Sequence, residues 1–187
     1  MYKEARQYFL SAYARYMAAP ENERDISRLT MIYTNLAESY MLEGDMDSTA
    51  QYIGRIEAEC KPHFGEMDNI YVDSLCARFC HLIGDAEKRD MYIDDLEKRL
   101  GGRVLIIDIF GDLYEFCLLM LELDRDDIVV EIINKIEEPI KKTRIANIKR
   151  KYLELKIRLY RRNNCEQKCI EAMNSFFDLS VQIEKDK

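Results

Sequence analysis

The chain contains few of the residues that interrupt helices. Its 187 residues include three prolines and seven glycines. Because proline breaks a helix interior and glycine weakens it, this composition permits long helices. No segment shows the sustained alternation of apolar and polar residues that is typical of a strand. The sequence therefore predicts an all-α protein.

Signals for export and for membrane insertion are also lacking. The N-terminus has no apolar core followed by a cleavage site, so we expect no secretory signal. The most apolar stretch, residues 104–123, contains Asp108, Asp112 and Glu115, whereas a membrane span needs about 20 largely uncharged residues. We therefore expect a buried helix there, a cytoplasmic protein and no membrane partner.

Patterns that would indicate catalysis are missing. His63 and His81 are the only histidines, and neither is spaced with a serine or cysteine nucleophile on a recognisable strand-turn-helix element. No glycine-rich loop that could hold a phosphate is present. We therefore expect no enzymatic activity from this chain, no catalytic residues and no cofactor.

The six cysteines favour a structural interpretation. Cys76–Cys80 and Cys165–Cys169 are each spaced i, i+4, with His81 beside the first pair. A zinc site normally needs three or four converging ligands, and this set is incomplete. Without an export signal the thiols are expected to be reduced, and cysteine commonly behaves as a small buried apolar residue. We predict buried thiols and no metal site.

The chain does contain an internal repeat, whose period is 40 and which has no insertions. We call a set of positions separated by this period a column. Four columns are apolar: Ala37, Ala77, Cys117 and Ile157; Tyr40, Cys80, Met120 and Tyr160; Ile53, Ile93, Ile133 and Met173; Ile56, Leu96, Ile136 and Phe176. A fixed period of roughly 20–50 residues is typical of stacked supersecondary units, so we predict a right-handed superhelical array of antiparallel helix pairs.

Residues typical of turns fall in the same register and divide each repeat into two helices. The first helix is expected to end near Gly44, Gly84, Asp124 and Asn164, because the residue after a helix often has a left-handed conformation. The second begins near carboxylates that can accept free backbone N–H groups, namely Asp45, Asp47, Asp85 and Asp126.

These signals predict nine helices in a single domain, residues 1–187. An orphan second helix, 1–19, precedes pairs at 28–61, 68–100, 107–140 and 144–184; its Tyr13 and Tyr16 lie one period before Ile53 and Ile56. Pro62 and Pro139 are expected to end the second helices of the first and third pairs, and Gly101–Gly102 that of the second pair.

The first repeat resembles a tetratricopeptide repeat. The resemblance is carried by Tyr33-x2-Leu36-Ala37-x2-Tyr40-x3-Gly44-Asp45, in which a small residue allows close helix approach and a tyrosine fills the groove between helices. The other repeats depart from this pattern, and the period is longer than the usual one of about 34 residues.

The C-terminal part is similar to a second family. The stretches 112–115, 136–140, 153–160 and 176–180 resemble the helical-repeat region that precedes the catalytic domain in many diguanylate cyclases of clostridial-type bacteria. In that family the last repeat helix continues into the cyclase. The Gly-Gly-(Asp/Glu)-Glu-Phe loop of such a cyclase is absent, since Arg103 and Val104 follow Gly101–Gly102. The resemblance therefore implies a regulatory portion, or a relative that lost the enzyme.

The last predicted helix could carry a coiled-coil seam. Ala172, Phe176, Leu179 and Ile183 follow a 4-3-4 spacing. The seam could continue as a linker helix or pair with a second copy in a homodimer. A capping helix with a polar outer face has a similar pattern.

The first helices of the pairs should line the concave side of such an array. The outward-facing residues of these helices form the predicted groove for a ligand or partner: Thr34, Glu38, Tyr71, Ser74, Arg78, His81, Tyr114, Lys151, Glu154, Arg158 and Arg161. An ordinary solvated face is the alternative for any one of them.

Charge is distributed unevenly. Residues 135–162 carry eleven Lys or Arg and three Glu, about +8, although the chain has a formal charge of −7. This basic end could meet an acidic partner, a phosphate ligand or a second copy. Nucleic acid is a weaker candidate, because aromatic residues are limited there to Tyr152 and Tyr160.

We therefore expect a sensory or regulatory module that binds a protein or peptide in the groove and controls a diguanylate cyclase output domain. One alternative is a free-standing adaptor that holds two proteins together. Another is a peptide-pheromone receptor, although no helix-turn-helix is recognisable before Arg28.

Overall fold

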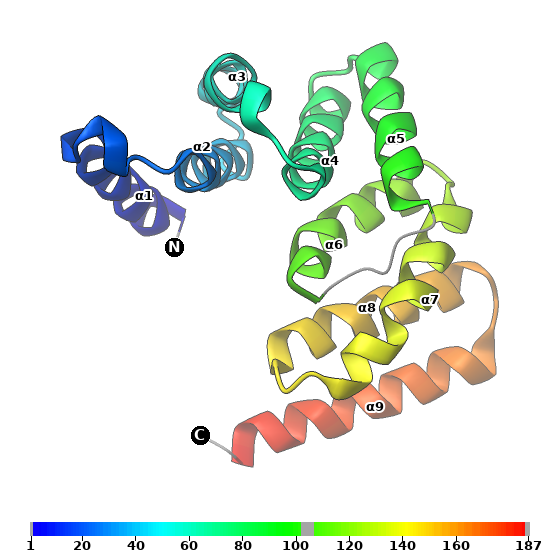
Figure 1. Cartoon of the computed structure of the whole chain (residues 1–187). Helices are drawn as coiled ribbons and strands as arrows, with labels where there is room; N and C mark the ends of the chain where they lie inside the picture. The colour runs from blue at the N-terminus through cyan, green and yellow to red at the C-terminus, as the bar shows by residue number, and fades with distance from the viewer. Residues whose placement is uncertain (1, 102–106, 186–187) are drawn as a thin grey trace. The chain divides into compact units, whose positions relative to one another are not determined.

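A computed structural model describes residues 2–101 and 107–185 of the chain (Figure 1). In this part the fold is all-helical and contains no strand, as predicted. Its nine α-helices are α1 (Tyr2–Ala18), α2 (Ile26–Met41), α3 (Met46–Arg55), α4 (Glu66–Leu82), α5 (Ala86–Leu100), α6 (Ile107–Glu122), α7 (Asp126–Lys142), α8 (Ala146–Arg162) and α9 (Glu166–Lys185). Gly102, in the predicted break, Arg103, and residues 104–106, at the start of the apolar stretch, lie outside the described residues.

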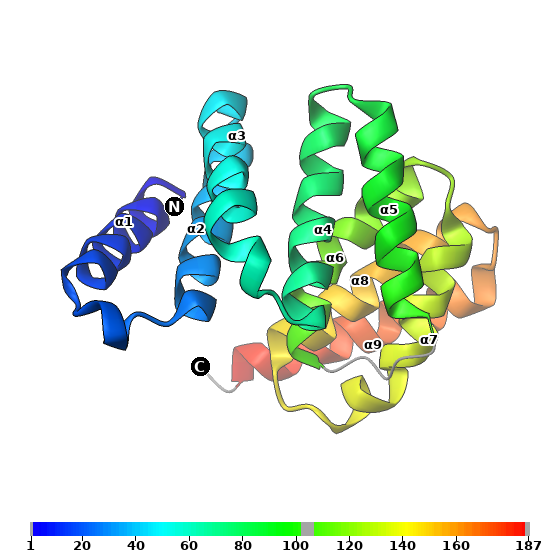
Figure 2. The same ribbon diagram turned by 45° about the horizontal axis from the view of Figure 1, so that its top comes forward.

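The chain divides into two compact units, Met1–Arg99 and Leu100–Lys187. In unit 1, α2 packs against α1, α3 and α4. In unit 2, α6 packs against α7 and α8, and α9 lies along α8 (Figures 1 and 2). Each unit thus contains helices that pack against their neighbours in the sequence. That the two units form one domain stays a prediction.

The apolar columns supply the core of each unit. In unit 1, Ala37 and Ile56 are fully buried, and Ala37 leaves room for close helix packing. In unit 2, Cys117 and Ile136 are fully buried at the equivalent columns. The period of the sequence therefore corresponds to a repeated core in both units.

The four predicted turns share one hydrogen-bonding pattern. Gly44, Gly84, Asp124 and Asn164 all have positive φ, from 53° to 81°. The N–H of the residue that follows each of them donates to a carbonyl in the last turn of the preceding helix, as in Asp45 N to Tyr40 O at 3.0 Å and Arg125 N to Met120 O at 2.8 Å. This is the Schellman arrangement that satisfies the last carbonyls of a helix.

Two of the predicted acidic caps are confirmed. Asp45 accepts a hydrogen bond from Ser48 N at 3.0 Å, and Asp85 accepts one from Lys88 N at 3.1 Å. The hydrogen bonds from Ser48 lower the pKa of Asp45 below its usual range. At the start of α7 the cap position is held by Arg125, which makes no capping bond through its side chain, and Asp126 lies in the first turn.

Two glycines allow a test of these turns. Gly84→Ala should lower the free energy of unfolding by about 1 kcal/mol, because only glycine adopts φ of +77° without strain. Gly54→Ala should raise it by about 0.5–1 kcal/mol, because Gly54 lies inside helix α3. An added Cβ has open space at both sites. Urea denaturation followed by circular dichroism measures both changes in the free energy of unfolding. Equal changes of the same sign would contradict the placement of Gly84 in a left-handed turn and of Gly54 inside a helix.

Pro139 does not end its helix, contrary to the prediction. α7 continues to Lys142 with Pro139 inside it. Proline removes only its own N–H, and Thr143 N still donates to Pro139 O at 3.1 Å. The extra turn also buries Ile140 one turn after Ile136. Pro62 does accompany a helix end: α3 continues as a π-helical turn, Ile56–Cys60, and the 3-10 turn Lys61–His63 follows.

Candidate functional site

Equivalent residues of neighbouring first helices contact one another in each unit. In unit 1, Arg78 Nη1 of α4 donates to Glu38 Oε1 of α2 at 2.7 Å. In unit 2, Lys151 Nζ of α8 donates to the carbonyl of Gly111 in α6 at 3.3 Å. Each of these pairs is separated by 40 in the sequence. The first helices therefore pack in register, so residues of one column lie next to each other.

Three predicted groove residues are buried, so their expected outward orientation was wrong. They are Thr34, Ser74 and Tyr114, which belong to one column. The Thr34 hydroxyl donates to the carbonyl of Thr30 in its own helix at 2.8 Å, which satisfies it without solvent. The in-register packing of the first helices places this column towards the neighbouring helix.

The remaining predicted residues fall into two sets. In unit 1, Glu38, Tyr71, Arg78 and His81 are half-buried on α2 and α4. In unit 2, Lys151 and Glu154 are half-buried on α8, and Arg158 and Arg161 are exposed there. That the two sets line one continuous groove stays a prediction.

The unit 2 set is linked by polar contacts. Lys151 Nζ lies 5.0 Å from the centre of the Tyr114 ring, and Arg158 Nη2 donates to Glu154 Oε1 at 2.9 Å. Burial raises the pKa of Tyr114, and its hydrogen bond to Glu154 raises it further. Burial alone would raise the pKa of Glu154, but hydrogen bonds from Arg158 and Tyr114 bring it below its usual range. Glu154 is therefore ionised at neutral pH, and Tyr114 is neutral.

A cavity of about 430 Å³ lies beside these residues, between the C-terminal halves of α6 and α8. Leu118 and Leu121 supply apolar surface. The charged lining residues are Glu122, Arg158, Arg161 and Arg162. The cavity therefore combines an apolar wall with three guanidinium groups, of which the sequence-based set included two.

The three arginines differ in how far they are already paired. Arg158 pairs with Glu154. Arg162 pairs with Asp124, and with Asp126 at 3.2 Å. Arg161 makes no ion pair or side-chain hydrogen bond to any residue in the described part of the chain. Its guanidinium is therefore available for a carboxylate or another anion from outside the chain.

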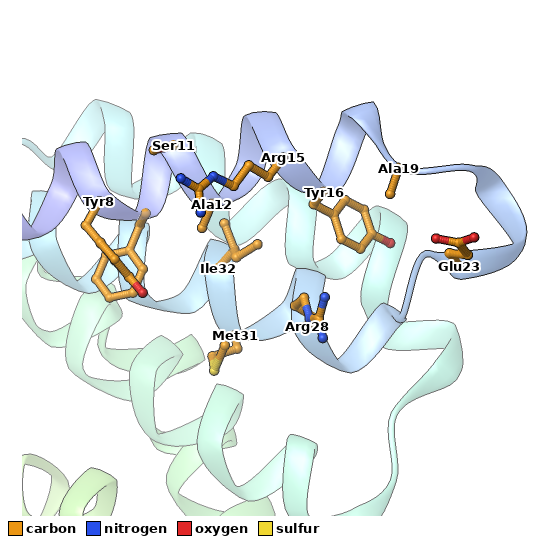
Figure 3. A pocket seen from close by; sticks show the side chains of 11 residues that line it. Tyr8, Ser11, Ala12, Arg15, Tyr16, Ala19, Glu23, Arg28, Met31 and Ile32 are labelled. Carbon is orange, nitrogen blue, oxygen red and sulfur yellow. The ribbon is translucent and has the colours of Figure 1, made fainter.

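A second cavity, of about 320 Å³, lies between α1 and α2 in unit 1. Figure 3 shows Tyr8 and Tyr16 extending from α1 on the side where Met31 and Arg28 of α2 lie. The sequence pattern did not indicate this cavity, because only the first helices of the pairs were expected to line a groove. The exposed Tyr8 and Met31 could not be distinguished from core residues by spacing alone.

The cysteines and histidines form no recognisable reactive site in the part of the chain that the structure describes. Cys60, Cys76, Cys80 and Cys117 are buried, and Cys165 and Cys169 are partly exposed. Burial raises the pKa of the Cys76 thiol to about 12 and raises that of Cys117 as well. Within residues 2–101 and 107–185 no group of three or more His, Cys, Asp or Glu is placed to hold a metal ion.

Comparisons with models of known protein families, with curated proteins and with solved structures find no match to this chain. None of the described helices combines the length and the apolar character needed to cross a membrane.

Proposed function

We propose that this chain is a non-catalytic binding module whose cavity between α6 and α8 takes an acidic peptide or protein segment. The observation that carries the proposal is the guanidinium of Arg161, which pairs with no described residue and lies beside Arg158, Arg162 and two leucines. Arginine can bind a carboxylate through two parallel hydrogen bonds, and these charge-assisted bonds are stronger than neutral ones.

The surrounding charge also favours an acidic partner. Residues 135–162 carry about +8, and they include all of α8. Such a local excess attracts an acidic segment before contact. Leu118 and Leu121 would then contact apolar side chains between its carboxylates. An acidic segment with interspersed apolar residues thus fits this cavity better than a purely apolar one.

The array is proposed to be a right-handed, tetratricopeptide-like superhelix with a sensory or regulatory role. The repeated columns, the four equivalent turns and the in-register contacts of the first helices support this arrangement. Control of a diguanylate cyclase output domain rests on the sequence resemblance alone. Binding could alter how neighbouring helix pairs pack and so reorient α9.

Arg161→Glu tests the proposed site. The probe is a fluorescent peptide that alternates Glu or Asp with Leu, and anisotropy measures its binding. We expect the variant to bind about tenfold or more weakly, because a charge-assisted hydrogen bond contributes about 1.5–3 kcal/mol and the new charge repels the peptide.

Arg150→Glu is the matched control for this experiment. Arg150 is also exposed on α8 but does not line the cavity. The control makes the same change in net charge, so it should reduce binding much less. Equal losses in the two variants would indicate general electrostatic attraction and contradict a site at Arg161.

A free-standing adaptor is the second candidate function. The observation in its favour is that each unit has a cavity of its own, one between α1 and α2 and one between α6 and α8. The native mass of the polypeptide, with the coding frame read past Lys187, separates the two candidates. A cyclase motif downstream supports the regulatory role, whereas a native mass near 22.2 kDa supports the adaptor.

A further inference from the structure

Helix α9 has an exposed apolar stripe. Ile170, Met173 and Phe177 are 52%, 46% and 68% exposed. Positions three and four residues apart share a helix face, so these three side chains form one stripe. The stripe differs from the predicted seam, whose Ala172 is buried and whose Phe176, Leu179 and Ile183 are half-buried. Of the seam residues, Ala172 lines a cavity together with Leu153, Lys156 and Tyr160 of α8.

The centre of the equivalent face is covered in two other second helices. In α3 and its π-helical continuation, Ala50, Ile53 and Glu57 face Cys76 and Phe79 of the following helix, α4. Ile53 and Cys76 are both buried, whereas Ala50 and Glu57 stay exposed. Helix α4 therefore covers the centre of this face of α3.

The same relation holds in unit 2. Val130 and Ile133 of α7 line a cavity with Leu159 and Tyr160 of α8; Ile133 is buried, and Val130 is 41% exposed. One period after Val130 and Ile133 come Ile170 and Met173 of α9. The exposed stripe is therefore equivalent to a surface that the following helix covers at its centre, at Ile53 in α3 and at Ile133 in α7.

Phe177 strengthens the apolar character of this surface. The other three members of its column are Glu57, Glu97 and Glu137. A glutamate there can remain partly solvated at the edge of a helix contact. A phenylalanine in the same position exposes apolar surface that becomes favourable when another helix covers it.

The stripe has an acidic residue at each end. Glu166 precedes Ile170 by four residues, and Glu184 follows Phe177 by seven, so both lie on the same face. Both are exposed, and neither makes an ion pair with a residue that the structure describes. The face is thus apolar in the middle and negatively charged at both ends.

The packing of α8 on α7 shows which partner such a face accepts. Glu166 is the equivalent of Asp126, and Arg162 of α8 pairs with Asp126 at 3.2 Å. Lys156 Nζ lies 3.6 Å from Glu137, the equivalent of Phe177. The helix that covers α7 therefore brings basic side chains to its acidic positions and apolar ones to the centre.

We propose that the outer face of α9 docks a basic amphipathic α-helix. The helix carries an apolar stripe that covers Ile170, Met173 and Phe177, with Lys or Arg near both ends to meet Glu166 and Glu184. A cation that reaches Phe177 adds an attraction to the face of its ring. This surface is separate from the cavity proposed for the acidic segment.

The test uses a labelled peptide with the sequence of residues 146–162. This segment is basic near both ends and carries a buried apolar stripe of Tyr152, Leu155 and Leu159 between them, and in the protein it packs against α7. We expect the full chain to bind this peptide, as measured by fluorescence anisotropy. Met173→Glu should weaken binding by about tenfold or more, because it places a charge at the position equivalent to the buried Ile133 of α7. A scrambled peptide of equal charge should bind similarly weakly to the unaltered protein.

Leu82→Glu is the matched control, because Leu82 is also an exposed apolar residue on a helix and lies outside α9. It should leave peptide binding unchanged. Both variants should keep the circular dichroism spectrum of the parent. Equal binding of the scrambled peptide, or no effect of Met173→Glu, would overturn the proposal.

Light scattering tests the alternative that a second copy of the chain covers this face. A concentration-dependent dimer of the unaltered protein that Met173→Glu converts to a monomer would assign the face to a second copy and overturn the basic-helix proposal. A monomer that binds the peptide supports it. Met173→Glu should also leave binding of the acidic peptide intact, so the two proposals can fail separately.

Discussion

Phe116→Ala should lower the free energy of unfolding by about 3–5 kcal/mol, because the ring is fully buried and its removal leaves a cavity. Phe116 lies in α6, which packs against both α7 and α8. The loss should therefore affect the unit formed by residues 100–187. Urea denaturation followed by far-UV circular dichroism measures the change.

Phe177→Ala is the matched control for this prediction. It deletes the same side chain from α9, where 68% of Phe177 is exposed, so we expect a change within about 0.5 kcal/mol. If unfolding has two transitions, only that of unit 2 should shift in Phe116→Ala. Similar losses in the free energy of unfolding of the two variants would show that Phe177 is covered in solution and would contradict its exposed position on α9.

Two of the six thiols should react with N-ethylmaleimide long before the other four. Cys165 and Cys169 are partly exposed, whereas Cys60, Cys76, Cys80 and Cys117 are buried. A maleimide reacts with the thiolate, and burial raises the pKa of all four buried thiols. Their reaction requires local opening of the fold.

Mass spectrometry of timed samples measures this difference. We expect two rapid additions, followed by reaction at least about a thousandfold slower at the buried sites, since native cores open rarely. All six should react quickly in denaturant. Rapid labelling of Cys117 in the native protein would contradict the packing of α6.

Helix boundaries follow closely from the sequence because their causes are local. Gly44 and Gly84 adopt left-handed backbone conformations, and Asp45 and Asp85 accept hydrogen bonds from N–H groups in the first turn of the next helix. These effects involve neighbours along the chain. Pro139 shows the limit of such reasoning, since burial of Ile140 accompanies an extra turn beyond the proline.

The candidate sites could be predicted less closely from the sequence, because they depend on which helix packs against each helix face. Helical spacing identifies a column but cannot tell which neighbour covers it. Thr34, Ser74 and Tyr114 are buried although the sequence analysis placed them outward. Met173 shares a column with three buried isoleucines, yet it is exposed on α9.

The sequence by itself determined that the protein is helical, where its helices turn and which columns repeat. These properties arise from backbone conformation and from the period of apolar residues, which act within a few turns of helix. Tertiary structure decided which arginine lacks a described partner and which apolar stripe is uncovered. Arg161 and Arg162 are adjacent in the sequence, but only Arg162 lies within reach of Asp124 and Asp126. The availability of a charge or an apolar face is set by contacts between helices that are distant in sequence.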